Sequence, residues 1–349
     1  MNKIENSKNR NLNLDYLRVF ATLATIILHV AAQNWEVADV NSFEWQIFNF
    51  YNSIVRWSVP VFVMISGTLF LGRNLTIKTI YSKYILRMVI AFCVWSSFYT
   101  FLYTDGKRDF VKYFIIGPYH LWFIWMIIAL YMAIPILKLF TERENITKYY
   151  ITLSVIFAFG IPTLGTIVSH FGNEKIQWVM ESVITAVNSM KFNVVLGFSL
   201  YFVLGYYIYS KELSTKQRGI IYLAGIVGFI MTIVLSSASS VKLQKHLVSY
   251  YSEFNLNVLL ESVAVFTFFK YVNWSKLKLD KLISKLSKYS FAVYLIHIWV
   301  LDRLQVNGLN TLSMNPVVSV PCISIIVLLI SFVIATILNH IPIVKKYIV

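Results

Sequence analysis

Residues 14–33 read LDYLRVFATLATIILHVAAQ, and this stretch decides the fold class. It matches the ~20 residues that an α-helix needs to cross the hydrocarbon core of a bilayer. Its polar side chains recur every three or four residues, which places them on one helix face. They are Asp15, Arg18, Thr22, Thr25, His29 and Gln33. The stretch therefore predicts a membrane-spanning helix with a polar stripe along one side.

The rest of the chain is similarly apolar. Hydrophobic residues make up 58% of its 349 residues and charged residues only 13%, whereas roughly a quarter of a soluble domain is charged. We therefore predict an all-α, polytopic membrane protein with about ten transmembrane helices, forming a single domain over residues 1–349. The predicted spans are 14–33, 47–71, 84–104, 119–140, 149–169, 194–210, 218–236, 255–272, 289–304 and 317–339.

The basic residues predict the orientation of these spans. If the spans alternate, 20 of the 31 Lys and Arg residues lie on the side of the two termini, against eight on the other side. Cytoplasmic segments carry such an excess, so the N- and C-termini are expected in the cytoplasm. The net charge of +15 does not predict nucleic-acid binding, because the basic residues are spread over short inter-span segments. Cys93 and Cys322 lie within apolar runs, which favours neither a disulfide nor a zinc site.

Charged side chains inside the predicted spans are candidate functional residues. Each costs ~2.5–3.5 kcal/mol even on the lenient insertion scale, so it persists where it faces a cavity or a partner. In the first span these are Asp15, Arg18 and His29. Arg18 and His29 are 11 residues apart on nearly the same face, about 16 Å along the axis. The alternative is a polar seam that only packs helices together, although such seams normally use Ser, Thr and Gly.

The second and third spans add three basic candidates. Arg56 is expected in the outer part of span two, with Glu261 of span eight as its counter-ion; alternatively Arg56 reaches the outer headgroups. Lys83 and Arg87 open span three, where they could bind a phosphate or nucleotide at the cytoplasmic face. Alternatively, Arg87 anchors the helix at the membrane interface.

Two more imidazoles lie in or near the spans. His120 and Trp122 open span four, and His297 lies within span nine. Each of the two histidines could belong to a functional site, or it could only pack between helices. No HExxH, Cys/His ligand set, GxSxG or P-loop is present, so no metal site and no ATP hydrolysis are predicted.

Six strings together resemble the acyltransferase-3 family of bacterial membrane O-acyltransferases. They occur in family order between residue 14 and about residue 300, and the similarity is closest to the branch that acetylates surface polysaccharides. The strings are LDYLRVFATLATIILHV, VPVFVMISGTLFL, KYILRMVIAFCVWSSFY, YHLWFIWMIIALYMAIPIL, YFVLGYYI and YSFAVYLIHIWV.

The resemblance implies a multi-pass enzyme of the bacterial plasma membrane that takes an acyl group, expected to be acetyl, from cytoplasmic acyl-CoA. The first-span arginine and histidine of the family carry over to Arg18 and His29. The family's basic motif at the start of span three carries over in part, to Lys83 and Arg87. No permanently bound cofactor is implied. The implied partners are acyl-CoA as donor, a glycan or lipid-linked sugar as acceptor, and the lipid bilayer.

The residue chemistry fits this role. Acyl transfer to a hydroxyl needs a base near pH 7, and imidazole is the side chain most easily tuned there. We expect His29 to be the general base, with Asp15 and Arg18 at the cytoplasmic mouth below it. His120 or His297 would orient the acceptor or stabilise the oxyanion. Direct transfer and an acyl-histidine intermediate both remain open.

Two other function classes are compatible with the sequence. One is an exporter of a polysaccharide or small molecule, coupled to protons through Asp15, His29 and Glu261. The other is a sensing or scaffolding membrane domain. Dependence on acyl-CoA separates the enzyme from the exporter.

Overall fold

The computed structural model describes residues 11–103, 107–190, 196–342 and 344, and within them it contains helices and no β-strand. The chain order is α1 (Leu12–Ala32), α2 (Phe43–Ser53), α3 (Ser58–Leu71), α4 (Ile77–Thr79), η1 (Ile80–Ile85), α5 (Leu86–Tyr103), α6 (Lys107–Ile116), η2 (Tyr119–Leu121), α7 (Trp122–Thr141), α8 (Glu144–Ser154), η3 (Val155–Gly160), α9 (Ile161–Phe171), α10 (Glu174–Ser189), α11 (Phe198–Ser210), α12 (Thr215–Leu243), α13 (Leu256–Tyr271), η5 (Trp274–Leu277), α14 (Asp280–Val306) and α15 (Pro316–His340). The all-α prediction is confirmed.

Seven helical segments are long and apolar enough to cross a membrane. They are Leu12–Ala32, Phe43–Leu71, Ile77–Tyr103, Phe110–Thr141, Glu144–Phe171, Thr215–Leu243 and Pro316–His340. The other three predicted spans correspond to α11 and α13, which are shorter, and to α14, which carries charges near both ends. The count of ten and the orientation stay predictions.

The second predicted span is interrupted rather than continuous. Helix α2 ends at Ser53, α3 begins at Ser58, and the turn between them is held by Trp57 Nε1, which donates to the Ile54 carbonyl at 2.8 Å. Pro60 explains the break, because it has no N–H and its ring excludes the carbonyl four residues earlier, which belongs to Arg56. The interruption therefore lies at Arg56.

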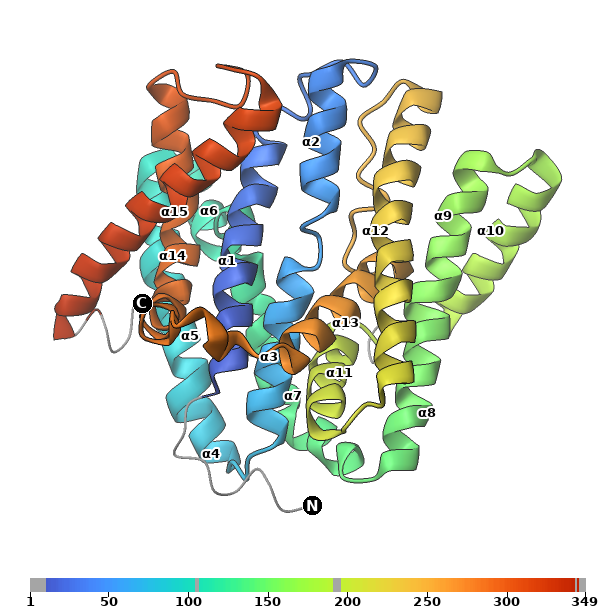
Figure 1. Cartoon of the computed structure of the whole chain (residues 1–349), viewed down its shortest axis with the longest axis horizontal. Coiled ribbons are helices and arrows are strands. Elements are labelled where there is room, and N and C mark those ends of the chain that lie inside the picture. Colours follow the sequence, from blue (N-terminus) through green and yellow to red (C-terminus); the bar gives the residue numbers. More distant parts are fainter. Residues whose placement is uncertain (1–10, 104–106, 191–195, 343, 345–349) are drawn as a thin grey trace.

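A second irregular segment precedes α13. The chain leaves the end of α12 and returns beside it without helical structure, so that α13 begins part-way down the bundle (Figure 1). Tyr250 and Tyr251 of this return segment are buried, and the Tyr251 hydroxyl donates to Asn49. Irregular backbone at this depth is tolerated where protein covers it.

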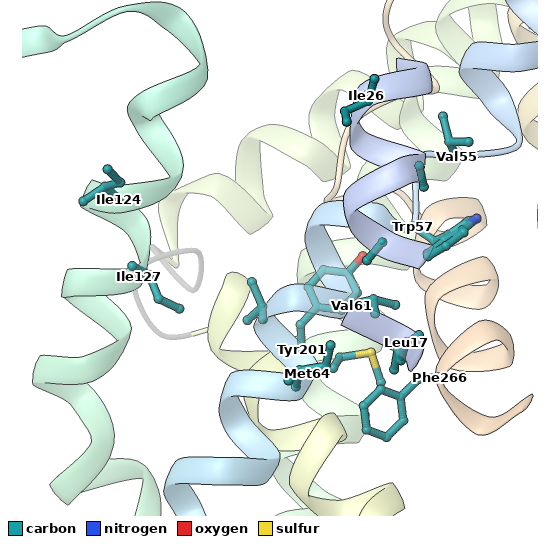
Figure 2. Close-up of a cluster of buried hydrophobic side chains, with 14 of the residues drawn as sticks. Leu17, Ile26, Val55, Trp57, Val61, Met64, Ile124, Ile127, Tyr201 and Phe266 are labelled. Atoms are coloured by element: carbon teal, nitrogen blue, oxygen red, sulfur yellow. The ribbon is translucent and has the colours of Figure 1, made fainter. Parts of the chain in front are cut away.

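The interior lies where α1, α3, α11 and α13 meet (Figure 2). Helices α3 and α11 touch backbone to backbone: a Cβ added to Gly67 would lie 1.8 Å from the Phe202 carbonyl oxygen, and one added to Gly205 would lie 2.0 Å from that of Met64. Helix α14 packs along α1, while α10 lies with α9 at the edge of the molecule (Figure 1). The long axis of α1 therefore runs through the centre of the bundle with α14 at its side.

Candidate functional site

The N-terminal end of α1 carries a three-residue polar cluster. Arg18 Nη1 donates to Ser287 Oγ of α14 at 3.0 Å, and that hydroxyl donates to Asp15 Oδ1 at 2.5 Å. The guanidinium also lies 3.5 Å from the same carboxylate oxygen. Asp15 is buried, whereas the Arg18 side chain is 27% exposed. The carboxylate and the serine thus hold an arginine whose side chain is partly exposed.

Arg87 lies near this cluster. It sits in the first turn of α5, and both Arg87 and Arg18 lie within electrostatic range of the Tyr131 hydroxyl of α7. Lys83, one turn earlier in η1, is exposed, with its Nζ 5.5 Å from the centre of the Tyr84 ring. Three basic side chains from α1, η1 and α5 therefore occupy the same end of the bundle.

Three histidines gather at the other end of the stripe. The ring centres of His29 (α1) and His297 (α14) are 5.2 Å apart, and those of His120 (η2) and His297 are 5.8 Å apart. His120 and His297 are 2% and 1% exposed, whereas His29 is only partly buried. His29 is therefore the most exposed imidazole of this group.

Hydrogen bonds define the proton positions on His297. Its Nδ1 lies 2.7 Å from the Tyr294 carbonyl oxygen, which can only accept, so Nδ1 carries the hydrogen and Nε2 keeps a lone pair. Within the described residues that Nε2 has no partner, and the buried His120 ring has no hydrogen bond of good geometry, although it lies near the Leu295 backbone. The Tyr294 hydroxyl donates to the His120 carbonyl at 2.6 Å and so ties η2 to α14.

Arg56 does not pair with Glu261, contrary to the prediction. Its guanidinium stacks on the Tyr251 ring, 4.0 Å from the ring centre, and donates to Asn52. Glu261 accepts instead from the Thr232 hydroxyl of α12, and no ion pair joins it to Arg56 within the described part of the chain. The cause is the break at Arg56, which turns this side chain toward the return segment that carries Tyr251.

Arg56 lies between the histidines and Glu261, within electrostatic range of both. It lies within electrostatic range of His29, and it faces Tyr251 from the return segment before α13. Trp122, in contrast, has Phe123 and Phe198 as its ring neighbours, so it lies beside α11 and outside the imidazole group. The structure thus brings His120 and His297 to His29, places Arg56 between this group and Glu261, and leaves Trp122 apart.

The comparison with protein families gives one match. A family model described as an acyltransferase domain, that of acyltransferase-3, matches residues 11–336, which is nearly the whole chain. The chain belongs to the acyltransferase-3 family. No curated protein and no solved structure matches it.

Several residues of this acyltransferase's site were not predicted from the sequence. Ser287 and Tyr294 lie on α14, and Tyr119 precedes His120; its ring meets His29 edge-on, with the ring centres 5.6 Å apart. Ser287 and Tyr294 are ten and three residues before His297, so a helical face drawn back from that histidine would have pointed to Tyr294. No three His, Cys, Asp or Glu side chains in the described ranges are placed to share a metal ion.

Proposed function

We propose that this acyltransferase moves an acyl group, acetyl in the first instance, from cytoplasmic acyl-CoA to a hydroxyl of a cell-surface or lipid-linked glycan. The protein would act in the bacterial plasma membrane. One observation supports the proposal above the others: His29 is the most exposed member of the three-histidine group, and it lies on the same helix stripe as Arg18 and Asp15.

His29 would act as the general base. It takes the proton of the acceptor hydroxyl while the hydroxyl oxygen attacks the thioester carbonyl carbon; the C–S bond then breaks, and the thiolate of CoA receives the proton from His29. The products are an ester and a free thiol. An acyl-His29 intermediate would use the same imidazole as nucleophile, and both routes remain open.

The neighbouring histidines would support this step. The lone pair on His297 Nε2 can accept a hydrogen bond from the imidazolium of His29, since Nδ1 of His297 is already committed to Tyr294. His297 is thereby favoured as an acceptor that orients His29. His120, whose buried ring has no hydrogen bond of good geometry, is the candidate for the oxyanion of the tetrahedral intermediate.

The acyl-CoA donor would bind at the N-terminal end of α1, at the end of the polar stripe opposite His29. Arg18, Arg87 and Lys83 would bind the phosphates of CoA, since guanidinium groups match phosphate oxygens in bidentate geometry. Arg18 and His29 are about 16 Å apart along α1. The flexible arm of CoA, which separates its phosphates from the thioester, would then follow the polar stripe toward His29.

Replacement of His29 tests the proposal. In His29→Gln and His29→Ala we expect acyl transfer to fall by ~10²–10⁴-fold, the usual contribution of a positioned acid–base group. The measurement is single-turnover transfer from radiolabelled acetyl-CoA by protein in nanodiscs. His340→Gln is the matched control, because His340 is exposed at the end of α15, far along the chain from the cluster. Wild-type turnover in His29→Gln would remove His29 from the mechanism.

An exporter is the second candidate function. The interrupted helix at Arg56 and the non-helical segment before α13 favour it, because broken helices at membrane depth form substrate sites in many transporters. Purified protein in liposomes separates the two functions. Transport of glycan without any acyl donor supports the exporter, and consumption of acetyl-CoA with transfer to a hydroxyl supports the enzyme.

A further inference from the structure

The rim of the bundle beyond the histidines combines a carboxylate with exposed phenol rings. The Tyr103 hydroxyl, at the end of α5, donates to Asp302 near the end of α14, and the Tyr103 ring stacks on Tyr99 with the planes 11° apart. Tyr103 is 45% exposed and Tyr119 is 65% exposed, while Asp302 is partly buried. We call Tyr103, Tyr119 and Asp302 the outer rim.

The outer rim is continuous with the candidate catalytic group. The Tyr119 ring contacts both His29 and His120, each with ring centres 5.6 Å apart. Asp302 follows His297 by five residues on α14, a rise of about 7.5 Å along the helix. A molecule held at the rim would therefore have part of its surface next to His29.

Two amides extend the rim on the other side of His29. Gln33, one turn beyond His29 on α1, donates through Nε2 to Gln305 Oε1 at 3.1 Å, and its own Oε1 accepts from the Thr311 N–H at 3.1 Å. Gln305 lies three residues after Asp302, so both occupy one face of α14. Gln305 is exposed and Gln33 half-buried.

We infer that the outer rim, together with Gln33 and Gln305, is the acceptor subsite and that it binds a neutral sugar residue. The inference rests on the proposed function. A sugar ring presents apolar C–H faces and several hydroxyls that both donate and accept. Exposed phenol rings provide surfaces for the C–H faces, the carboxylate accepts from hydroxyls, and the amides do both.

The composition of the rim argues against two other acceptors. A lipid alcohol needs an apolar groove, whereas the rim presents a carboxylate and two amides that a lipid chain cannot hydrogen-bond. A phosphorylated or carboxylated group would lie against the same carboxylate, and like charges repel. A sugar unit that carries no charge can hydrogen-bond to the rim without electrostatic repulsion.

The geometry also assigns the reacting hydroxyl. With the sugar ring against Tyr119, a hydroxyl directed inward faces His29, whose ring the phenol touches. The other hydroxyls face Asp302 and Gln305 at the exposed end of α14. The rim thereby positions the acceptor, while His29 takes the proton of the inward hydroxyl as described above.

Two substitutions test the subsite. Asp302→Asn removes the negative charge with little change of shape, and Tyr119→Leu removes the exposed ring. Acyl transfer from acetyl-CoA to chemically deacylated surface glycan of the same cells is measured in nanodiscs, giving KM for each substrate. We expect either substitution to raise the glycan KM about ten-fold or more, with the acetyl-CoA KM unchanged. Tyr119→Phe should recover most of the affinity.

The controls keep the inference separable from the proposed function. Arg303→Gln alters the exposed neighbour of Asp302, and Tyr149→Leu removes an equally exposed tyrosine of α8; both should keep the wild-type glycan KM. An unchanged acetyl-CoA KM in Asp302→Asn shows that the variant is folded. A glycan KM unchanged in both rim variants, or transfer to lipid in place of glycan, overturns the subsite. Wild-type protein that transfers to no acceptor overturns the proposed function instead.

Discussion

Arg87 is the residue on which the proposed donor site can be tested most directly. It shares the neighbourhood of Tyr131 with Arg18, although the two arginines come from α5 and α1. Two guanidinium groups held near one phenol make a basic site at the end of the polar stripe opposite His29.

Arg87→Ala should raise the KM for acetyl-CoA about ten-fold or more and leave the acceptor KM nearly unchanged, because a lost phosphate contact weakens the donor complex alone. Arg87→Lys should restore only part of the affinity, since a point charge cannot replace a bidentate fork. The measurement is steady-state acyl transfer in nanodiscs with each substrate varied. A wild-type donor KM in Arg87→Ala would assign the residue to membrane anchoring.

The residues on the α1 stripe could be predicted from the sequence because they depend on one helix alone. Asp15, Arg18 and His29 are related by helical spacing, which needs no knowledge of the neighbouring elements. The assembly of His29 with His120 and His297 depends on how α14 and η2 pack on α1. Sequence spacing carries no information about that packing. Each histidine could therefore be proposed as a site residue, but the proximity of the three could not be predicted.

At the scale of elements, the closest contact joins α3 and α11. Gly67 and Gly205 each face a backbone carbonyl of the other helix at a distance that leaves no room for a methyl group. Close approach of this kind lets two helices gain dispersion contacts and is typical of helix pairs in membranes.

Gly67→Ala should therefore lower the unfolding temperature clearly, because the new methyl group collides with rigid backbone; overpacking costs about 1–3 kcal/mol, occasionally more. Gly219→Ala on α12 is the matched control. No atom lies within 4 Å of a Cβ added there, and alanine favours a helix over glycine by about 0.8–1.0 kcal/mol, so stability should stay equal or rise. Thermal unfolding of both variants in detergent, followed by circular dichroism, gives the comparison. Equal melting of Gly67→Ala and wild type would mean that α3 and α11 can separate freely.

The interrupted second span shows why one pairing was predicted wrongly. Hydropathy averages composition over a window, so residues 47–71 read as one continuous helix. The break that follows from Pro60 changes the direction of Arg56, and Glu261 then finds its hydrogen bond with Thr232. Pro60 could be seen in the sequence. Its consequence could not, because Arg56 now contacts Tyr251, and Tyr251 lies in a non-helical segment that has no periodic sequence pattern.

At the scale of the whole molecule, α1 connects two chemically different ends of the bundle. It has 21 residues and is therefore about 31 Å long, close to the ~30 Å thickness of the hydrocarbon core. One end carries the basic residues Arg18, Arg87 and Lys83, and the other carries the histidines and the outer rim. This division suits the proposed function, in which an anionic donor binds at one end and the acceptor at the other.

Two exposed segments lie at opposite ends of α1. An experiment can determine on which side of the membrane each of them lies. Residues 270–288 lie at the start of α1, where Asn13 donates to the Lys270 carbonyl at 2.9 Å and Tyr16 stacks on Trp274. Val37 follows the far end of α1 and is 77% exposed. Because residues 270–288 are rich in lysine, the positive-inside rule predicts that they face the cytoplasm and that Val37 faces outward.

Single cysteines decide between the two orientations. In a background with Cys93→Ser and Cys322→Ser, Val37→Cys should react with a membrane-impermeant maleimide in intact cells, whereas Lys278→Cys should react only after the cells are opened. Both positions are exposed, so a difference in labelling reflects the side of the membrane and not burial. Labelling of Lys278→Cys in intact cells would reverse the orientation. The basic end would then face outward, away from the cytoplasmic acyl-CoA, and Arg18, Arg87 and Lys83 would have to bind a different anion.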